Sequence, residues 1–155
     1  MAQIIKPPTP FAHIEQPTVF LAGTIDNGTG PDWQSTVEQS LQDLDILILN
    51  PRRDEWDATW EQSIHNPQFK EQVTWELDGQ EQADVILMYF APGSKSPITL
   101  LELGLFAHTQ KLFICCPPGF WRRGNIEVVA SRYNLPFFDD LDTLITTLRQ
   151  QLHHI

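Results

Sequence analysis

Residues 84–111, DVILMYFAPGSKSPITLLELGLFAHTQK, decide the fold of this chain. They open with an apolar run at 85–90, which is too short to span a membrane and has the composition of a fully buried parallel strand. A loop of Pro, Gly, Ser and Lys follows. Ser96 and Pro97 then suit the cap and the first position of a helix. This strand–loop–helix unit predicts an α/β protein.

One carboxylate, Glu102, stands among leucines in the second turn of that helix, close to the carboxyl end of the strand. Open parallel sheets bind their ligands at this end. A buried carboxylate is costly unless it is paired or used in a site. Local spacing alone leaves two readings open, a side chain in solvent and a side chain in a site.

Five apolar segments have the pattern of buried strands, and amphipathic segments with helical spacing follow them. The expected strands are 18–22, 46–49, 85–90, 111–116 and 135–138. Such alternation predicts a doubly wound parallel sheet with helices on both faces. We expect the strand order 2-1-3-4-5 of flavodoxin-like folds, in which the first and third strands meet at the switch point where ligands bind.

The chain divides into an arm and one domain. Residues 1–17 hold four of the twelve prolines and predict an extended N-terminal arm, either mobile or laid along a neighbouring surface. Residues 18–155 are long enough for a single domain with a sizeable core. Within it we expect the apolar segment that begins at Phe69 to form a helix, and Pro67 to break any helix that crosses it.

Two loops at the carboxyl ends of strands are candidate walls of a binding site. The loop at 23–30 contains three glycines, whose backbone can approach a ligand closely, and includes Gly23, Thr24 and Asp26. It matches neither a P-loop nor a dinucleotide fingerprint. The loop at 50–57 mixes aromatic and charged groups, so Arg53 and Asp57 are candidate contacts for a nucleobase. A solvated charged loop is the alternative.

Composition bounds the partners. The net charge is −10, with 20 acidic and 10 basic residues, which argues against a nucleic-acid groove but not against a neutral nucleoside. We see no signal peptide and no membrane span, so a cytoplasmic location is the expectation. The adjacent Cys115 and Cys116 point to opposite faces of a strand and predict two buried thiols rather than a disulfide. The histidines lack metal-ligand spacing, and we expect no metal or cofactor.

Taken together, these motifs resemble the nucleoside 2-deoxyribosyltransferase family and its relatives, the deoxynucleoside 5′-monophosphate N-glycosidases. The resemblance covers about residues 18–138. Its motifs are VFLAG at 19–23, WEL at 75–77, AD at 83–84, Pro92 followed ten residues later by Glu102-Leu103-Gly104, and Gly124-Asn125.

The resemblance implies transfer of 2-deoxyribose between the bases of 2′-deoxynucleosides, a reaction of nucleotide salvage. Glu102 matches the nucleophile that attacks C1′. Glu76, eight residues before Asp84, matches the acid that holds and protonates the base. Ser96 stands where relatives place a residue that binds a sugar hydroxyl. Asn125 matches an asparagine that reaches the site of a neighbouring subunit.

Two other functions stay open. One is hydrolysis of deoxynucleoside 5′-monophosphates, which requires a phosphate cradle of Ser and Arg near the first loop. The other is a non-catalytic nucleotide-binding module.

We also expect a homo-oligomer, a dimer or an assembly of dimers, in which the long loop 117–125 of one chain closes the pocket of the next. Phe120 and Trp121 in that loop are large apolar groups of the kind that marks an interface when exposed. Alternatively, these two side chains fold back onto their own chain.

Overall fold

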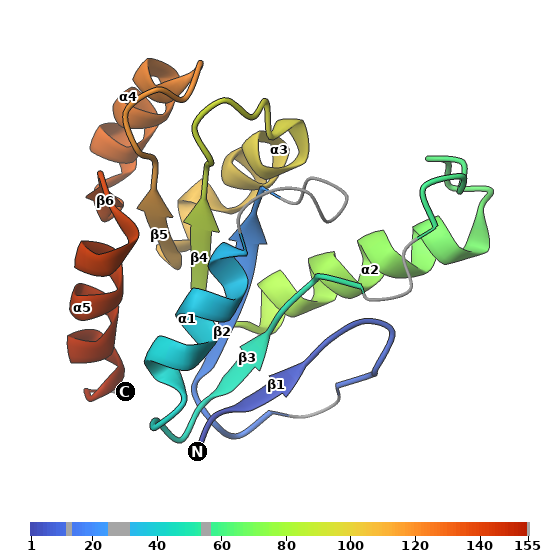
Figure 1. Cartoon of the computed structure of the whole chain (residues 1–155), viewed down its shortest axis with the longest axis horizontal. Helices are drawn as coiled ribbons and strands as arrows, with labels where there is room; N and C mark the ends of the chain where they lie inside the picture. The colour runs from blue at the N-terminus through green and yellow to red at the C-terminus, as the bar shows by residue number, and fades with distance from the viewer. Residues whose placement is uncertain (12–13, 25–31, 54–56, 155) are drawn as a thin grey trace.

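The computed structural model describes residues 1–11, 14–24, 32–53 and 57–154. A parallel sheet runs through the molecule with helices on both of its faces (Figure 1). The elements are, in chain order, β1 (Gln3–Ile5), β2 (Thr18–Gly23), α1 (Trp33–Leu41), β3 (Leu47–Leu49), α2 (Pro67–Gln82), β4 (Val85–Tyr89), α3 (Pro97–Phe106), the 3-10 turn η1 (Ala107–Thr109), β5 (Leu112–Cys115), α4 (Arg123–Tyr133), β6 (Phe137–Phe138) and α5 (Leu141–Leu152).

The sheet has six strands in the order β1-β3-β2-β4-β5-β6. The expectation of a five-stranded flavodoxin-like sheet is therefore corrected. The additional strand, β1, comes from the N-terminal arm and pairs in parallel with β3. The backbone N–H of Gln3 donates to the carbonyl of Ile46, and that of Asn50 to the carbonyl of Ile5, both at 3.0 Å. The arm thereby covers backbone groups of β3 that an edge strand leaves unpaired.

The switch point lies between β2 and β4, which are neighbours in the sheet. Gly23, the last residue of β2, stands opposite Tyr89, the last residue of β4. The chain leaves these two strands in opposite directions across the sheet, because β3 flanks β2 and β5 flanks β4. The loops after Gly23 and after Tyr89 therefore start side by side.

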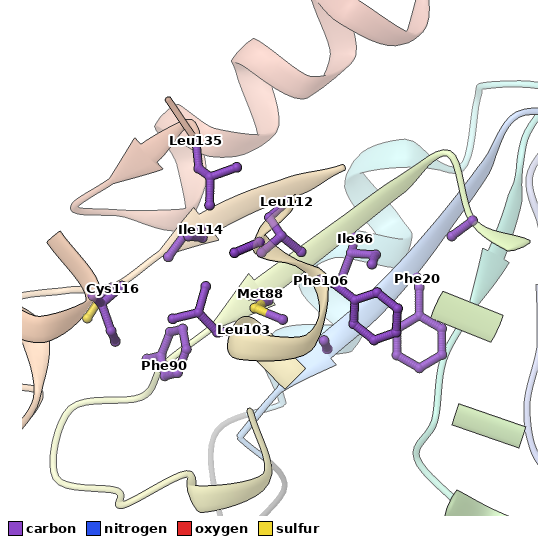
Figure 2. Packing of buried hydrophobic residues seen from close by; sticks show 14 of the residues in the cluster. Phe20, Ile86, Met88, Phe90, Leu103, Phe106, Leu112, Ile114, Cys116 and Leu135 are labelled. Carbon is purple, nitrogen blue, oxygen red and sulfur yellow. The ribbon is translucent and has the colours of Figure 1, made fainter. Parts of the chain in front are cut away.

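Two apolar clusters hold the helices against the sheet. On one face, α2, α3 and α4 bury Trp75, Leu103 and Ile126. Figure 2 shows Leu103 of α3 beside Met88 of β4 and Phe90, the residue after β4, and Phe106 of α3 beside Ile86 of β4 and Phe20 of β2. On the other face, α1 and α5 pack through a second cluster, which contains Trp33, Val37, Leu41, Leu144 and Leu148. Alternate strand residues point to opposite faces, so each of the strands β2 to β6 serves both clusters.

Two helices begin earlier than expected. Helix α2 begins at Pro67 rather than Phe69, because Asn66 caps it by accepting the Phe69 N–H at 3.0 Å and proline suits a first position. Pro67 therefore starts the helix instead of breaking it. Helix α4 begins at Arg123, which places Asn125 in a first turn and not in a loop.

Cys115 and Cys116 are free and buried, as the strand pattern predicts. In the part of the chain that the structure describes, no helix combines the length and the apolar character needed to cross a membrane.

Candidate active site

Three hydroxyl groups meet at the switch point. The Thr24 Oγ1 lies 2.5 Å from the Ser96 Oγ and 3.2 Å from the Ser94 Oγ, and the two serine oxygens are 2.9 Å apart. Thr24 is fixed there because its hydroxyl accepts from the Ala91 N–H at 3.0 Å and its carbonyl accepts from the Trp33 indole at 2.9 Å. The cluster joins the loop after β2 to the loop after β4.

Ser96 differs from its sequence-based expectation. It occupies the cap position of α3 but adopts a left-handed conformation, with φ 45° and ψ 54°, and its side chain does not cap the helix. A non-glycine residue in this region is uncommon and carries a conformational cost. Here the hydroxyl turns toward Thr24 and Ser94. Ser96 thus belongs to the switch-point cluster, together with Ser94, which the motifs did not single out.

Gly23 allows the close approach of β2, β4 and α1 just before this cluster. A Cβ at this position would stand 2.6 Å from the carbonyl oxygen of Tyr89 and 2.6 Å from a ring carbon of Trp33. Neither the backbone oxygen nor the indole is a flexible chain end. Only glycine fits here without moving a strand or the start of α1.

We expect Gly23→Ala to lower the free energy of unfolding by roughly 1–3 kcal/mol, as overpacking of a tight site does. Urea unfolding followed by circular dichroism measures the change. Gly124→Ala is the matched control, because a Cβ there meets nothing within 4 Å, and its midpoint should equal or exceed that of the wild type. A Gly23→Ala protein as stable as the wild type would show that the strands accommodate the methyl group.

Glu102 points inward, so the reading in which its side chain lies in solvent is wrong. Its side chain is on the buried face of α3, and the residue is only 7% exposed. The Gln80 amide donates to Glu102 Oε2 at 2.5 Å. Burial raises the pKa of Glu102 to about 7, and this hydrogen bond acts in the opposite direction. The carboxyl group is therefore held in a site of low polarity with one defined partner.

Glu76, on α2, is partly buried and lies close enough to Glu102 for the charge of Glu102 to act on it. Burial, followed by the negative charge of Glu102, raises the pKa of Glu76 to about 8. The Gln72 amide donates to Glu76 Oε1 at 3.3 Å and to the carbonyl of Pro51 at 2.9 Å. The negative charge of Glu102 thus opposes ionisation of Glu76, which favours a state with one ionised and one protonated carboxyl group. Pairs of this kind divide the roles of nucleophile or base and acid.

The two glutamines are functional candidates that the sequence reasoning missed. Neither Gln72 nor Gln80 is among the candidate residues that the sequence motifs indicate. The available signal was spacing: Gln72, Glu76 and Gln80 are four residues apart and share one side of a helix. A polar line of this kind on a helix that packs against a sheet indicates a site.

Arg53 and Asp57, the two predicted base contacts in the loop after β3, lie in different surroundings. The Arg53 side chain is 10% exposed, pairs with Glu71 at 2.9 Å and lies over the Trp60 ring at 5.0 Å. Asp57 is exposed and accepts hydrogen bonds from the N–H and hydroxyl groups of Thr59, which lower its pKa. Asp57 therefore closes a local turn. Asp26 lies outside the described residues.

Asn125 and the two aromatic residues of the loop at 117–125 also lie in different surroundings. Asn125 is exposed on α4, and within the described residues no hydrogen bond joins it to Glu76 or Glu102. Phe120 is buried and packs on Phe90 at 5.1 Å between ring centroids, so it folds back onto its own chain. Trp121 is 49% exposed, and its indole donates to the carbonyl of Lys95 at 3.0 Å.

The described residues contain no group of three or more histidine, cysteine, aspartate or glutamate side chains arranged to hold a metal ion. The donors of the site are instead carboxyl, amide and hydroxyl groups, which suit an uncharged polar ligand.

Comparison with known proteins adds a family to this geometry. A family model described as "Nucleoside 2-deoxyribosyltransferase like" matches residues 16–120. The matched region contains Gly23, Glu76, Ser96 and Glu102 and ends before Asn125. No curated protein matches the chain significantly.

Proposed function

Because this chain belongs to the nucleoside 2-deoxyribosyltransferase-like family, we propose that it transfers 2-deoxyribose between nucleobases through a glycosyl ester on Glu102. The observation that carries this proposal is the pair of Glu76, which is partly buried, and Glu102, which is buried: burial raises both pKa values, and each carboxyl group has its own amide donor.

In the first half-reaction, ionised Glu102 attacks C1′ of a deoxynucleoside. The C1′–N bond breaks with its electron pair going to the base, which takes the proton of Glu76. In the second half-reaction, a new base attacks C1′, gives its proton to Glu76 and releases Glu102 as a carboxylate. Two displacements through a covalent intermediate are the logic of retaining glycoside chemistry.

The switch-point hydroxyls are positioned to hold the sugar. Thr24, Ser94 and Ser96 can donate to and accept from a sugar hydroxyl, because each hydroxyl group rotates to suit its partner. The same cluster supports a second candidate function, hydrolysis of deoxynucleoside 5′-monophosphates, because hydroxyl groups also bind phosphate oxygens. Arg52, in the loop after β3, pairs at 3.3 Å with Asp32, the residue that caps α1.

A single experiment separates these functions. Purified protein is incubated with deoxyinosine and free adenine, and separately with deoxyinosine 5′-monophosphate, and the products are resolved by liquid chromatography. Deoxyadenosine in the first mixture supports the transferase. Release of hypoxanthine only from the monophosphate supports the hydrolase, and no product in either mixture supports a binding module.

We further propose that the active unit is a homo-oligomer. On helix α3, the apolar residues Ile98, Leu101 and Leu105 are 59%, 60% and 53% exposed. Nearby, the indole of Trp121 donates a hydrogen bond to the carbonyl of Lys95, the residue before the cap of α3. A helix that is apolar on its outer side as well as its inner side is normally covered. The exposed position of Asn125 fits a role in the site of a neighbouring chain.

We expect light scattering at micromolar concentration to give a mass well above the 17.8 kDa of one chain. Mixing inactive Glu102→Ala and inactive Asn125→Ala proteins should restore activity, because a hybrid dimer has one pocket with both residues intact. A monomeric mass would contradict the assembly. No recovery after confirmed subunit exchange would place Asn125 outside a shared site.

A further inference from the structure

Helix α2 buries two amide side chains at the candidate site. Gln72 is 6% exposed and Gln80 is fully buried, and each donates to one of the two carboxyl groups. In both glutamines the side-chain Oε1 is buried and has no hydrogen-bond partner among the described residues. An unpaired buried acceptor is unfavourable, and an apolar side chain of similar volume avoids it. Filling space alone therefore does not account for a glutamine at position 80.

Gln80 is held firmly in place. The residue before it, Gly79, lies so close to the sheet that a Cβ there would stand 2.8 Å from the ring of Phe20. Beyond it, the Lys111 ammonium group donates to the carbonyl of Glu81 at 2.7 Å. The Gln80 amide also donates to the backbone carbonyl of Glu76 at 3.2 Å. The end of α2 is thereby fixed against the sheet, and the amide points at α3.

This contact makes the two oxygens of Glu102 unequal. Oε2 accepts from Gln80 at 2.5 Å, whereas Oε1 has no hydrogen bond within the described residues. We infer that Gln80 is a positioning residue, which holds Oε2 of Glu102 and leaves Oε1 as the oxygen that attacks the substrate. This inference rests on the proposed function, in which Glu102 is the nucleophile.

The Oε1–C1′ bond forms while the C1′–N bond breaks, and the leaving base takes its electron pair and a proton from Glu76. Oε2 becomes the carbonyl oxygen of the glycosyl ester and still accepts from the Gln80 amide. The hydrogen bond therefore persists through both half-reactions and limits rotation of the carboxyl group, which favours a near-attack geometry.

We expect Gln80→Met, which keeps the length but removes the donor, to lower kcat roughly 10- to 100-fold, as the loss of one hydrogen bond to a charged group does. The KM for the deoxynucleoside should change less than about threefold. Gln82→Met is the matched control, because it makes the same change at an exposed position of the same helix, and it should leave kcat unchanged.

The pH profile gives a readout that a purely structural role would not move. The Gln80 hydrogen bond lowers the pKa of Glu102, so its loss should shift the acidic limb of kcat/KM to higher pH. The charged groups near this contact are Glu76 on α2, whose own pKa the charge of Glu102 raises, and the ammonium group of Lys111, which binds the backbone carbonyls of Gln80 and Glu81 at the end of α2. Neither is changed by the substitution.

Carbon-13 NMR of glutamate-labelled protein tests the contact without any substrate, with Glu102→Gln used to assign the resonance. The titration of Glu102 should move to higher pH in Gln80→Met and in Gln80→Asn, whose amide is one methylene too short. An unmoved titration in a folded variant would overturn the inference, as would an unchanged kcat. If the wild type proves inactive, the proposed function fails, while the NMR result still decides whether Gln80 holds Glu102.

Discussion

Glu102→Gln is expected to abolish transfer of deoxyribose, with a loss of at least about ten-thousand-fold in kcat, because an amide cannot displace a base from C1′. The substitution preserves size, and the neighbouring Gln80 amide can still donate to the new carbonyl oxygen. Formation of deoxyadenosine from deoxyinosine and adenine measures the loss. Intact-mass spectrometry of the wild type with deoxynucleoside alone should show a deoxyribosyl adduct on the peptide that contains Glu102. A variant with substantial activity would rule out the covalent mechanism.

Thermal unfolding supplies the control for this variant. Burial raises the pKa of Glu102 in the folded chain to about 7 from an ordinary value of 4.5. The folded wild type therefore binds more protons than the unfolded chain between these values and loses stability as pH rises through them. Glu102→Gln has no proton to lose and should be more stable than the wild type at pH 9, by roughly 1–3 kcal/mol. The two proteins should converge below about pH 4.

The switch-point part of the candidate site could be predicted from the sequence, because it follows from strand order and chain direction. The apolar runs ending at Gly23 and Tyr89 are strong strand signals, and in the structure their ends lie side by side. Motif spacing singles out Glu102 and Glu76, and in the structure the charge of Glu102 acts on Glu76. Local patterns could not decide that Glu102 points inward, because α3 is apolar on both its inner and outer sides.

The remainder depends on contacts between segments that are distant in the chain. Gln80 lies 22 residues before Glu102, and only the packing of α2 beside α3 makes it a partner of the carboxyl group. The strand β1 forms because β3 offers it an open edge, and three residues in a proline-rich arm carry too weak a pattern to indicate this. Ser96 has good cap chemistry, yet the hydroxyls of Thr24 and Ser94 compete successfully for its side chain.

The substitution with the second largest expected effect is Glu76→Gln, which should slow turnover about a hundred- to ten-thousand-fold, the usual contribution of a general acid. Glutamine keeps the size of the side chain and its contact with Gln72 but carries no proton to give to the leaving base. The loss should be larger for bases that leave poorly and smaller for bases that leave easily as anions. Initial rates with a series of deoxynucleosides measure this difference.

The pH profile identifies the role of Glu76 independently of the size of the loss. Glu102 must be ionised to attack, so wild-type kcat/KM should fall below about pH 7, and Glu76 must hold its proton, so it should also fall above about pH 8. Because the two groups interact, these limits belong to the pair. In Glu76→Gln the alkaline limb should vanish while the acidic limb remains. Asp78→Asn is the matched control, since Asp78 is exposed on the outer side of the same helix, and it should retain both limbs and nearly full activity. If Asp78→Asn proved the more damaging of the two, the assignment of the acid on α2 would be wrong.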